Sequence, residues 1–472
     1  MINIEDLTIE KISEGFRKKD FSATDITKAY LERVKKYDKE INSFITVCDD
    51  LALKEAEKRD KLISQNDFSL PLLGIPVGLK DLYLTKGIKT TAASKVLDNH
   101  IGQYDATAVE RLKNAGAIIL GKTNCDAWAH GSSGENSDFG PTRNPWNKEY
   151  IPGGSSSGSA ACVTSGFAAF STGTDTGSSI LLPASFTNIV GLKPTYGLVS
   201  RYGIIAMASS LDSIGHFTKT VKDSALILNI TAGIDGHDAT LVEKREKDYS
   251  QGIEKGVKGL KIGIPKEYVE KGLDPQIHRT FKQSVEIFKK LGAQIKEVSL
   301  PHTEYAIAAY YIIQPSEVSS NLARYDGVRY GNPRDYFGDE AKRRILIGTF
   351  TLSAGYYDAY YKKAMQVRTL IKEDFEKVFE SVNVLLTPVS PTPPWKLGEK
   401  VNDPLKMYLS DILTVSTNLS GIPGLAMPAG FTSNNLPIGI QLLGPHFSEK
   451  ILFRAGFAFE QETKLFEKTP KL

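Results

Sequence analysis

Cysteine is scarce in this chain: only Cys48, Cys125 and Cys162 occur among 472 residues. They form no Cys-X-X-Cys pair, and they make no ligand cluster with the seven histidines. Both absences argue against a structural metal site and against a disulfide framework. We therefore expect no metal in this chain and a reducing compartment, either the cytoplasm or an organellar matrix.

Long apolar runs and charge of one sign are missing as well. No stretch approaches the ~18 consecutive apolar residues of a membrane span, and the N-terminal segment lacks the pattern of a signal peptide. The net charge is only +3, from 58 basic and 55 acidic side chains. No global basic field therefore indicates RNA binding by this chain itself, and we expect no membrane partner.

The chain does contain 41% hydrophobic residues, which is enough to bury a large core. Apolar runs typical of buried strands alternate with segments of helical periodicity, such as Ala106–Ala115 and Asp274–Leu291. This alternation predicts an α/β layer fold with a mostly buried sheet. The expected strands are Ile75–Lys80, Ala117–Gly121, Leu260–Ile264, Gln294–Val298 and Val382–Thr387.

The N-terminal segment is expected to be helical. Ser22 and Asp25 have the spacing of a capping box, and the apolar residues that follow fall on one helical face. We expect this face to pack on the body of the protein rather than on a partner. Its residues are Ile26, Ala29, Tyr30, Val34 and Tyr37. Further along, the charged and weakly periodic segment from 243 to 258 is expected to be a linker or a surface excursion.

Two loops rich in serine and glycine lie close together, at Gly153–Ser159 and Gly173–Ile180. A serine hydroxyl can attack an amide carbonyl if a base accepts its proton and donors hold the developing oxyanion. Glycines near Ser179 allow consecutive backbone N–H groups to converge on one point. Neither loop has the Gly-Lys-Ser/Thr ending of a phosphate-binding P-loop or a GxGxxG pattern, so phosphate binding is disfavoured.

A lysine is the candidate base. Lys80 ends an apolar run that predicts a buried strand, so its amine is placed to project into the interior. Burial disfavours the ammonium form and lowers the pKa of a lysine, and only neutral lysine can accept a proton. Together the two loops and Lys80 predict an amide-cleaving serine site that uses lysine in place of histidine.

These residues resemble the amidase signature family, whose Gly-Gly-Ser-Ser-Gly-Gly-Ser and Gly-Thr-Asp-Thr-Gly-Gly-Ser-Ile motifs each align here with one substitution. The resemblance implies that Ser179 is the nucleophile, Ser155 a bridging serine that follows a cis peptide bond, and Lys80 the base. It also implies one α/β domain over residues 1–472, with a mixed sheet of about eleven strands flanked by helices on both faces. We place an N-terminal helical segment at about 1–66, the catalytic core at about 67–220 and a specificity part at about 259–472.

The same resemblance supplies further roles. Backbone N–H groups of Thr176, Gly177 and Ser178, with that of Ser179, would form the oxyanion hole. Thr174 and Asp175 would support the reacting groups without touching the substrate.

Several segments narrow the resemblance to the A subunits of aspartyl/glutamyl-tRNA amidotransferases, among them 319–331, 342–345, 355–361 and 407–411. Such subunits hydrolyse glutamine and pass ammonia to a partner, where misacylated tRNA is amidated after ATP activation. The resemblance implies B and C subunits as partners, with tRNA held mainly by the former and with ATP and Mg²⁺ used there. Arg344 would bind the α-carboxylate of glutamine, Asp411 its α-ammonium, and Tyr310 would complete the pocket.

The chain departs from the family pattern close to these residues. Ser157 and Ser178 each replace a glycine, and Leu181-Leu182 stand where Arg-Gln is usual. If Ser178 needs a backbone angle that only glycine adopts, the oxyanion hole is reshaped, and loss of the arginine leaves Asp175 in need of another donor. Other replacements are Thr187-Asn188 for Cys-Gly and His130 for methionine.

Three functions therefore stay open at this point. The first is a glutaminase subunit of a tRNA-dependent amidotransferase, acting for Glu-tRNA(Gln) or Asp-tRNA(Asn). The second is a stand-alone amidase on a small carboxamide, which the apolar Leu181-Leu182 pair would suit. The third is a catalytically weakened scaffold subunit.

Overall fold

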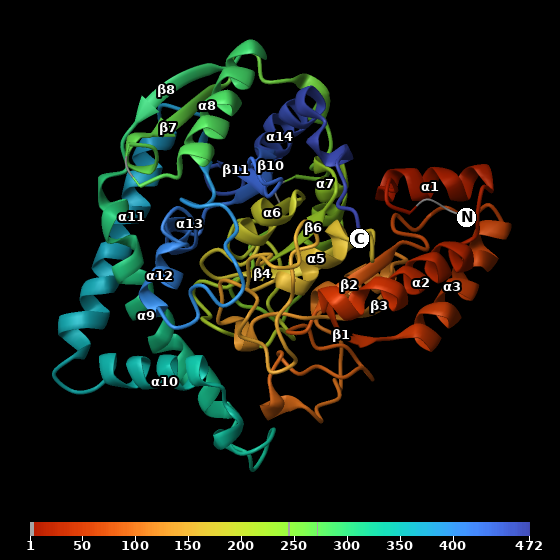
Figure 1. Ribbon diagram of the computed structural model, residues 1–472, viewed down its shortest axis with the longest axis horizontal. Helices are drawn as coiled ribbons and strands as arrows, with labels where there is room; N and C mark the ends of the chain where they lie inside the picture. Colours follow the sequence, from red (N-terminus) through yellow and green to blue (C-terminus); the bar gives the residue numbers. More distant parts are fainter. Residues whose placement is uncertain (1–3, 244–245, 271) are drawn as a thin grey trace.

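The computed structural model describes residues 4–243, 246–270 and 272–472. At its centre is one mixed sheet of eleven strands, in the spatial order β1-β3-β2-β4-β6-β5-β10-β11-β9-β7-β8 (Figure 1). The sheet confirms the predicted α/β class and strand number. The strands are β1 Phe44–Val47, β2 Pro76–Lys80, β3 Ile118–Thr123, β4 Phe170–Asp175, β5 Val190–Lys193, β6 Ser213–Thr218, β7 Lys261–Pro265, β8 Gln294–Val298, β9 Val384–Pro388, β10 Gly424–Phe431 and β11 Pro437–Leu443.

Helices cover this sheet and extend beyond it on two sides. In Figure 1, α1 to α3 lie at the right of the molecule, and α9 to α11 form its left side. The helices are α1 Ile9–Lys18, α2 Ala23–Ile41, α3 Asp49–Ser64, α4 Thr107–Asn114, α5 Ser157–Thr164, α6 Leu181–Thr187, α7 Val221–Thr231, α8 Pro275–Lys290, α9 Ala306–Asn321, α10 Asp339–Thr351, α11 Lys363–Phe379, α12 Pro404–Leu409, α13 Val415–Ser420 and α14 Glu449–Thr463.

Both faces of the sheet are buried, as strand β10 shows. Successive side chains of a strand point to opposite faces. Ala426 belongs to the apolar cluster that contains Leu181 of α6, whereas Leu425 belongs to the cluster that contains Leu452 of α14. The prediction of helices on both faces is therefore confirmed, and a fully buried sheet centre explains the continuous apolar runs seen in the sequence.

The expected elements agree with the structure to within about two residues at their ends. Strand β8 has the predicted bounds, although most of its side chains are exposed because it is an edge strand. Helix α8 begins after the cap residue Asp274 and ends before Leu291.

The N-terminal predictions are also confirmed. Ser22 and Asp25 form the expected capping box of α2, and Ile26, Tyr30 and Val34 are buried in the main core. This helical face therefore packs on the body of the protein.

The segment from 243 to 258 is partly described, since residues 244 and 245 lie outside the described residues. The rest contains a short 3₁₀ helix at Ile253–Lys255 that packs against α14. Ile253 is buried in the main core, so the segment is held on the surface rather than serving as a free linker. Within the described residues, no helix has both the length and the apolar character that crossing a membrane requires.

Candidate active site

Lys80 lies at the end of β2, the third strand from one edge of the sheet, with β3 on one side and β4 on the other. Its side chain is fully buried. The Nζ atom donates hydrogen bonds to Ser155 Oγ at 2.8 Å, to Ser156 Oγ at 2.9 Å and to Thr174 Oγ1 at 2.8 Å. The structure therefore brings together Lys80, Ser155 and Thr174, all predicted from sequence. Ser156 was missed, although it directly follows Ser155.

The surroundings of Lys80 favour the neutral amine. Burial lowers the pKa of Lys80 to about 8, and nearby acidic side chains such as Asp126 and Asp175 only partly oppose this shift. A lysine with a pKa near 8 can accept a proton close to neutral pH, as a general base must.

Ser155 follows the cis peptide bond between Gly154 and Ser155, which the resemblance implied. Its backbone is held from one side by Asp126, whose N–H donates to the carbonyl oxygen of Ser155 at 3.1 Å. Gly154 N–H donates to the carbonyl oxygen of Ser132 at 2.7 Å. These contacts fix the backbone of Ser155, whose hydroxyl accepts a hydrogen bond from the Lys80 amine.

Ser179 lies in the connection from β4 to α6 and is nearly buried. Its carbonyl oxygen accepts a hydrogen bond from Ser156 N–H at 3.3 Å, which ties the two serine loops together. In the described part of the chain, the four backbone N–H groups from Thr176 to Ser179 donate no hydrogen bond. Unpaired N–H groups are rare in protein interiors, so this run is suited to hold an oxyanion. We call residues 176–179 the oxyanion segment.

Asp175 fixes the far end of this connection. Its Oδ2 atom accepts hydrogen bonds from the N–H groups of Ile180 at 2.6 Å and Leu181 at 3.2 Å. Burial raises the pKa of the Asp175 carboxyl, and the buried Lys193 opposes that shift. Backbone donors to Oδ2 and the nearby charge of Lys193 therefore take over part of the role of the missing arginine, while Oδ1 of Asp175 has no hydrogen-bond partner among the described residues.

Ser178 does not distort the oxyanion segment. It is not among the residues with a positive φ, so this position does not need a backbone angle that only glycine adopts. Its hydroxyl instead donates to Asp411 Oδ1 at 2.8 Å. The replacement of glycine by serine thus links the oxyanion segment directly to the carboxylate that we predicted to bind the substrate ammonium.

Asp411 and Arg344 face the same group of tyrosines. The Tyr311 hydroxyl donates to Asp411 Oδ2 at 3.1 Å, and the Tyr311 ring stacks on Tyr408 at a centroid distance of 3.8 Å. The Arg344 guanidinium carbon lies 5.2 Å from the Tyr311 ring centroid and 5.3 Å from that of Tyr408. The predicted cation and anion are therefore joined through Tyr311, which sequence reasoning missed.

Tyr310, which we predicted to complete the substrate pocket, does not contact Asp411 as Tyr311 does but lies against the oxyanion segment. Its ring covers Gly177, where an added Cβ would lie 2.8 Å from Tyr310 Cζ, so only glycine permits the contact. Tyr310 thus packs directly on the oxyanion segment.

Arg344 is buried in α10 and makes two side-chain hydrogen bonds. Its Nε donates to Glu340 Oε1 at 2.8 Å, and its Nη1 donates to Gln314 Oε1 at 2.6 Å. Gly348 makes this possible, because a Cβ at that position would collide with the carbonyl of Pro315 and hold α10 away from α9. Glu340 and Gln314 were not predicted, although Glu340 precedes Arg344 by the four residues of a helical ion pair.

The other residues that differ from the family pattern lie in the interior of the protein. Leu181 and Leu182 are fully buried in apolar clusters on either side of α6, so neither is available to make a pocket suited to less polar substrates. Asn188 adopts the left-handed conformation with φ of 63° at the end of α6, which asparagine tolerates in place of glycine. Ser157 donates a hydrogen bond to Thr142 Oγ1 at 3.1 Å.

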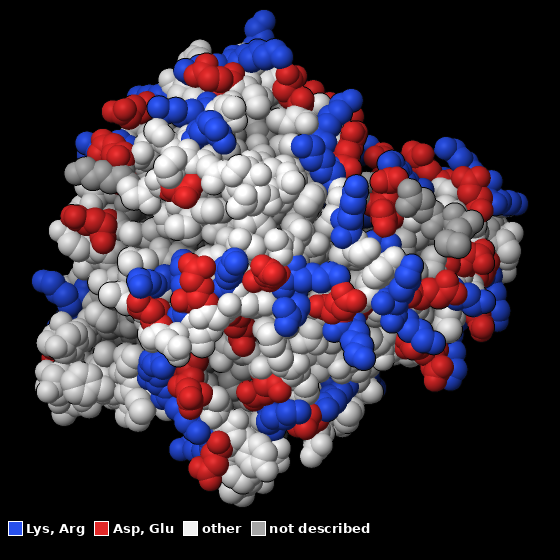
Figure 2. All heavy atoms as spheres, in the orientation of Figure 1, with Lys and Arg blue, Asp and Glu red and all other residues white. Residues whose placement is uncertain are grey.

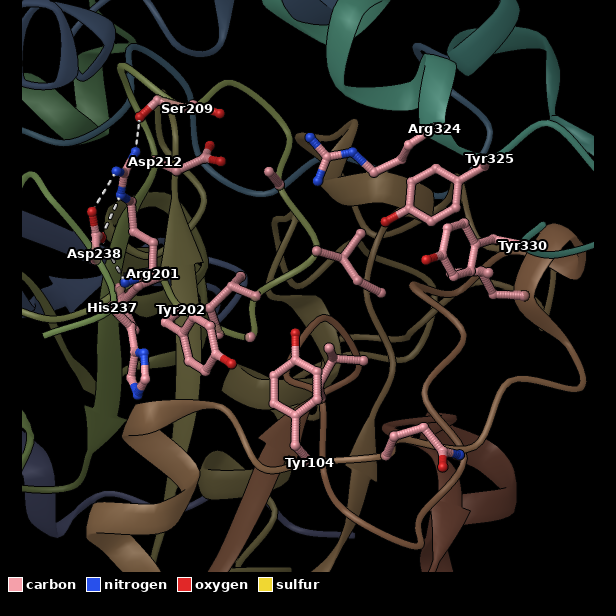
Figure 3. Close-up of a pocket in the computed structure, with 18 of the residues that line it drawn as sticks. Tyr104, Arg201, Tyr202, Ser209, Asp212, His237, Asp238, Arg324, Tyr325 and Tyr330 are labelled. Atoms are coloured by element: carbon pink, nitrogen blue, oxygen red, sulfur yellow. Dashed lines mark hydrogen bonds and ion pairs between the residues drawn. The ribbon is translucent and has the colours of Figure 1, made fainter. Parts of the chain in front are cut away.

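A cavity of about 730 Å³ lies next to the oxyanion segment (Figure 3). Asp212 lines it and accepts a hydrogen bond from Thr176 Oγ1 at 2.7 Å. Burial raises the pKa of Asp212 to about 6. Lys80, Ser155 and Ser179 are not among the lining residues, and the hydrogen bond between Thr176 and Asp212 connects the second serine loop to the cavity lining. Aromatic and basic residues that also line it include Tyr104, Tyr202, Arg324, Tyr325 and Tyr330.

In the part of the chain that the structure describes, no group of three or more His, Cys, Asp or Glu side chains could hold a metal ion.

Comparisons with known proteins agree with this geometry. The family model described as amidase matches residues 25–453. The A subunit of the glutamyl-tRNA(Gln) amidotransferase of Geobacter metallireducens is 53% identical over 473 residues, covering 97% of each chain. That of Carboxydothermus hydrogenoformans is 51% identical and covers 99% of each. Among solved structures, the A subunit of the Thermotoga maritima glutamyl-tRNA(Gln) amidotransferase matches with a TM-score of 0.83 and 42% identity, over 98% of this chain and 96% of that one.

Proposed function

The chain belongs to the amidase family, and on that basis we propose that it is the glutamine-hydrolysing A subunit of a tRNA-dependent amidotransferase. Its relatives are named as subunits of glutamyl-tRNA(Gln) amidotransferases, which favours misacylated Glu-tRNA(Gln) as the acceptor and Gln-tRNA(Gln) as the product. The observation that carries the proposal is the Ser178–Asp411 hydrogen bond of 2.8 Å. It places a buried carboxylate beside the oxyanion segment, where the ammonium of an α-amino acid needs a fixed anion.

In this proposal Ser179 Oγ attacks the carboxamide carbon of glutamine. The proton passes through Ser155 to the neutral amine of Lys80. The N–H groups of residues 176–179 receive the negative charge that develops on the carbonyl oxygen. Ammonia leaves with a proton returned from Lys80, and water then hydrolyses the glutamyl ester to release glutamate.

Substrate recognition rests on fixed charges at the other end of glutamine. Arg344 binds the α-carboxylate, and Asp411 binds the α-ammonium. Both side chains are buried, at 2% and 4% exposure, so these charges act with little screening by solvent. The stand-alone amidase is less favoured, because a small neutral carboxamide carries neither of the two charges that Arg344 and Asp411 could bind.

The released ammonia passes to a partner subunit in a heterotrimer that this chain forms with the B and C subunits. We assign tRNA binding mainly to the former, together with ATP and Mg²⁺, and we place the assembly in the cytoplasm or an organellar matrix, where translation occurs. On the face in Figure 2, basic and acidic side chains are intermixed, without the large basic field that binding tRNA by this chain alone would favour.

One surface supports the partner proposal. Near the end of α10 and in the π-helix Tyr357–Lys362, several large apolar side chains are exposed. Leu346 is 70% and Phe350 50% exposed, and the Phe350 ring lies 4.2 Å from that of Tyr356. Exposed clusters of this kind mark sites of protein association. We call Leu346, Phe350, Tyr356, Tyr357 and Tyr360 the aromatic face; the turn between α10 and α11 is the mostly uncharged area at the lower left of Figure 2.

We expect Phe350→Glu to weaken assembly with the partner proteins by tenfold or more, because a charge would be buried in the interface. Titration of the purified partners measures this. Val328→Glu is the matched control, since Val328 is an exposed apolar residue outside the aromatic face. Equal affinities for wild type and Phe350→Glu would remove the aromatic face from the interface.

The direct test of the proposed function is glutamate release from glutamine. It is measured for this chain alone and with its partners, with and without ATP and Glu-tRNA(Gln). We expect release to rise at least tenfold in the complete assembly, because a glutaminase coupled to a second site gains from being active only when an acceptor is ready. Unstimulated release, or faster cleavage of other carboxamides, would instead identify a stand-alone amidase, and no release under any condition a scaffold.

A further inference from the structure

His130 is a buried side chain that the mechanism above does not use. It follows the short 3₁₀ helix Ala127–Ala129 and is only 1% exposed. Neither ring nitrogen has a hydrogen-bond partner among the described residues. A buried polar group without a partner is unfavourable, and a neutral imidazole offers one donor and one acceptor. These nitrogens therefore indicate a ligand that the chain itself does not supply.

The segment that carries His130 runs along the catalytic serines. A Cβ at Gly131 would lie 3.0 Å from the backbone nitrogen of Ser155. The next residue, Ser132, accepts the hydrogen bond from Gly154 N–H through its carbonyl oxygen. The two residues that follow His130 in the chain therefore pack against Gly154 and Ser155.

The same segment reaches the ammonium end of the proposed pocket. Burial raises the pKa of Asp411, and hydrogen bonding from Ser178 and then Ser132 opposes that shift. The Ser132 hydroxyl also lies 3.1 Å from that of Ser410. The segment from 130 to 132 therefore lies between the reacting serines and Asp411.

Packing brings the segment that carries His130 close to α10, the helix of Arg344. The ring of Trp128, two residues before His130, lies 5.3 Å from the ring of Phe337, which is two residues before the first residue of α10. Burial lowers the pKa of His130 well below its usual value, and the Arg344 cation lowers it further. A neutral ring close to a guanidinium cannot contribute charge, so its contribution to a substrate is a directed N–H.

Gln314 is a second buried group without its full set of partners. Its Oε1 accepts from Arg344, but its Nε2 has no partner among the described residues. The side-chain hydrogen bonds of Arg344 described above use Nε and Nη1, which leaves Nη2 as a further donor. A carboxylate has about four acceptor sites, so donors from Arg344, Gln314 and His130 match a single carboxylate well.

From this arrangement we propose that His130 is a specificity residue that donates a ring N–H to the α-carboxylate of the substrate, beside Arg344 and Gln314. The inference rests on the proposed function and extends it. It selects α-amino acid carboxamides that keep a free carboxylate over those that lack one.

The test compares glutamine with 4-aminobutanamide, which is glutamine without the α-carboxylate, in the full chain with its partners. For His130→Met, a side chain of similar size without a donor, we expect the preference for glutamine, as a ratio of kcat/KM values, to fall about tenfold or more. The loss should reside in KM rather than kcat. His130→Gln, which restores an N–H donor, should recover part of the preference.

Two further variants serve as a comparison and a control for this result. Arg344→Gln should reduce the preference more strongly than His130→Met. His302→Met is the matched control, because His302 is only partly buried and pairs with Asp374 through its ring nitrogen at 2.9 Å. Glutamine affinity measured by thermal shift in a Ser179→Ala background should fall with His130→Met and not with His302→Met, which gives a readout without turnover.

The outcomes distinguish failure of the proposed function from failure of the proposed role of His130. If wild type releases no ammonia from glutamine, the proposed function itself fails. If wild type is active but His130→Met keeps its preference for glutamine, or loses glutamine and 4-aminobutanamide turnover equally, His130 only packs the site and the inference is overturned.

Discussion

Ser179→Ala is expected to lower glutamine hydrolysis by about 10⁴-fold or more, because the variant cannot form the glutamyl ester. The fold should be unchanged, since the Ser179 hydroxyl makes no hydrogen bond to another described side chain and its anchoring contact with Ser156 uses the main chain. Steady-state ammonia release measures the loss, and mass spectrometry of the wild-type chain during turnover should detect the ester on Ser179.

Two controls separate loss of chemistry from loss of structure. With free ammonia as the nitrogen donor, amidation of Glu-tRNA(Gln) by the assembly should continue, because only the glutaminase step is removed. Ser157→Ala, in the neighbouring loop, loses only the hydrogen bond to Thr142 and should keep most of its activity. Glutamine turnover by Ser179→Ala at the wild-type rate would sink the assignment of the nucleophile.

Lys80→Met is expected to lower kcat by about 10³-fold or more, because among the described residues no other base contacts Ser155 Oγ. Lys80→Arg should be equally inactive, since arginine stays protonated at any accessible pH. Both variants should keep amidation that depends on free ammonia. Glutaminase activity near the wild-type level in either variant would exclude Lys80 as the base.

The pH profile of the wild-type chain gives an independent check on the same residue. Lys80 accepts a proton only when neutral, and its pKa lies at about 8. Therefore kcat/KM for glutamine should rise about tenfold per pH unit below that value and level off above it. A profile that is flat from pH ~6.5 to ~9 would contradict a base with this pKa.

Much of the fold could be predicted because its signals are local. The run before Lys80 is apolar and lacks helical spacing, and it forms the fully buried strand β2. Ser22 and Asp25 form a capping box because the two residues are three apart on one chain segment. The strand order could not be predicted from periodicity, because β5 pairs with β10 across more than 200 residues of sequence and no local pattern encodes that contact.

In the candidate site too, some contacts could be predicted from local motifs and others depend on packing. Ser155 and Thr174 lie in the two serine and glycine loops, and Lys80 ends an apolar run; the family resemblance predicted that the three meet, and their amine and hydroxyls lie in contact. The chemical roles assigned to the triad, to the oxyanion donors and to Arg344 and Asp411 stay predictions that the variants above test. Tyr311 was missed because neighbours on a helix point in different directions, and only the packing of α9 decides which tyrosine meets Asp411.

By itself, then, the sequence determined the α/β class, the serine and glycine loops, and the buried lysine, since these follow from hydrophobic pattern and motif. Only the tertiary structure decided what the unusual residues do. Ser178 meets Asp411 across 233 positions, and His130 is buried near Arg344 without a partner of its own among the described residues. The physical reason is that burial, hydrogen-bond partners and pKa depend on which distant segments pack together, and these contacts exist only in the folded chain.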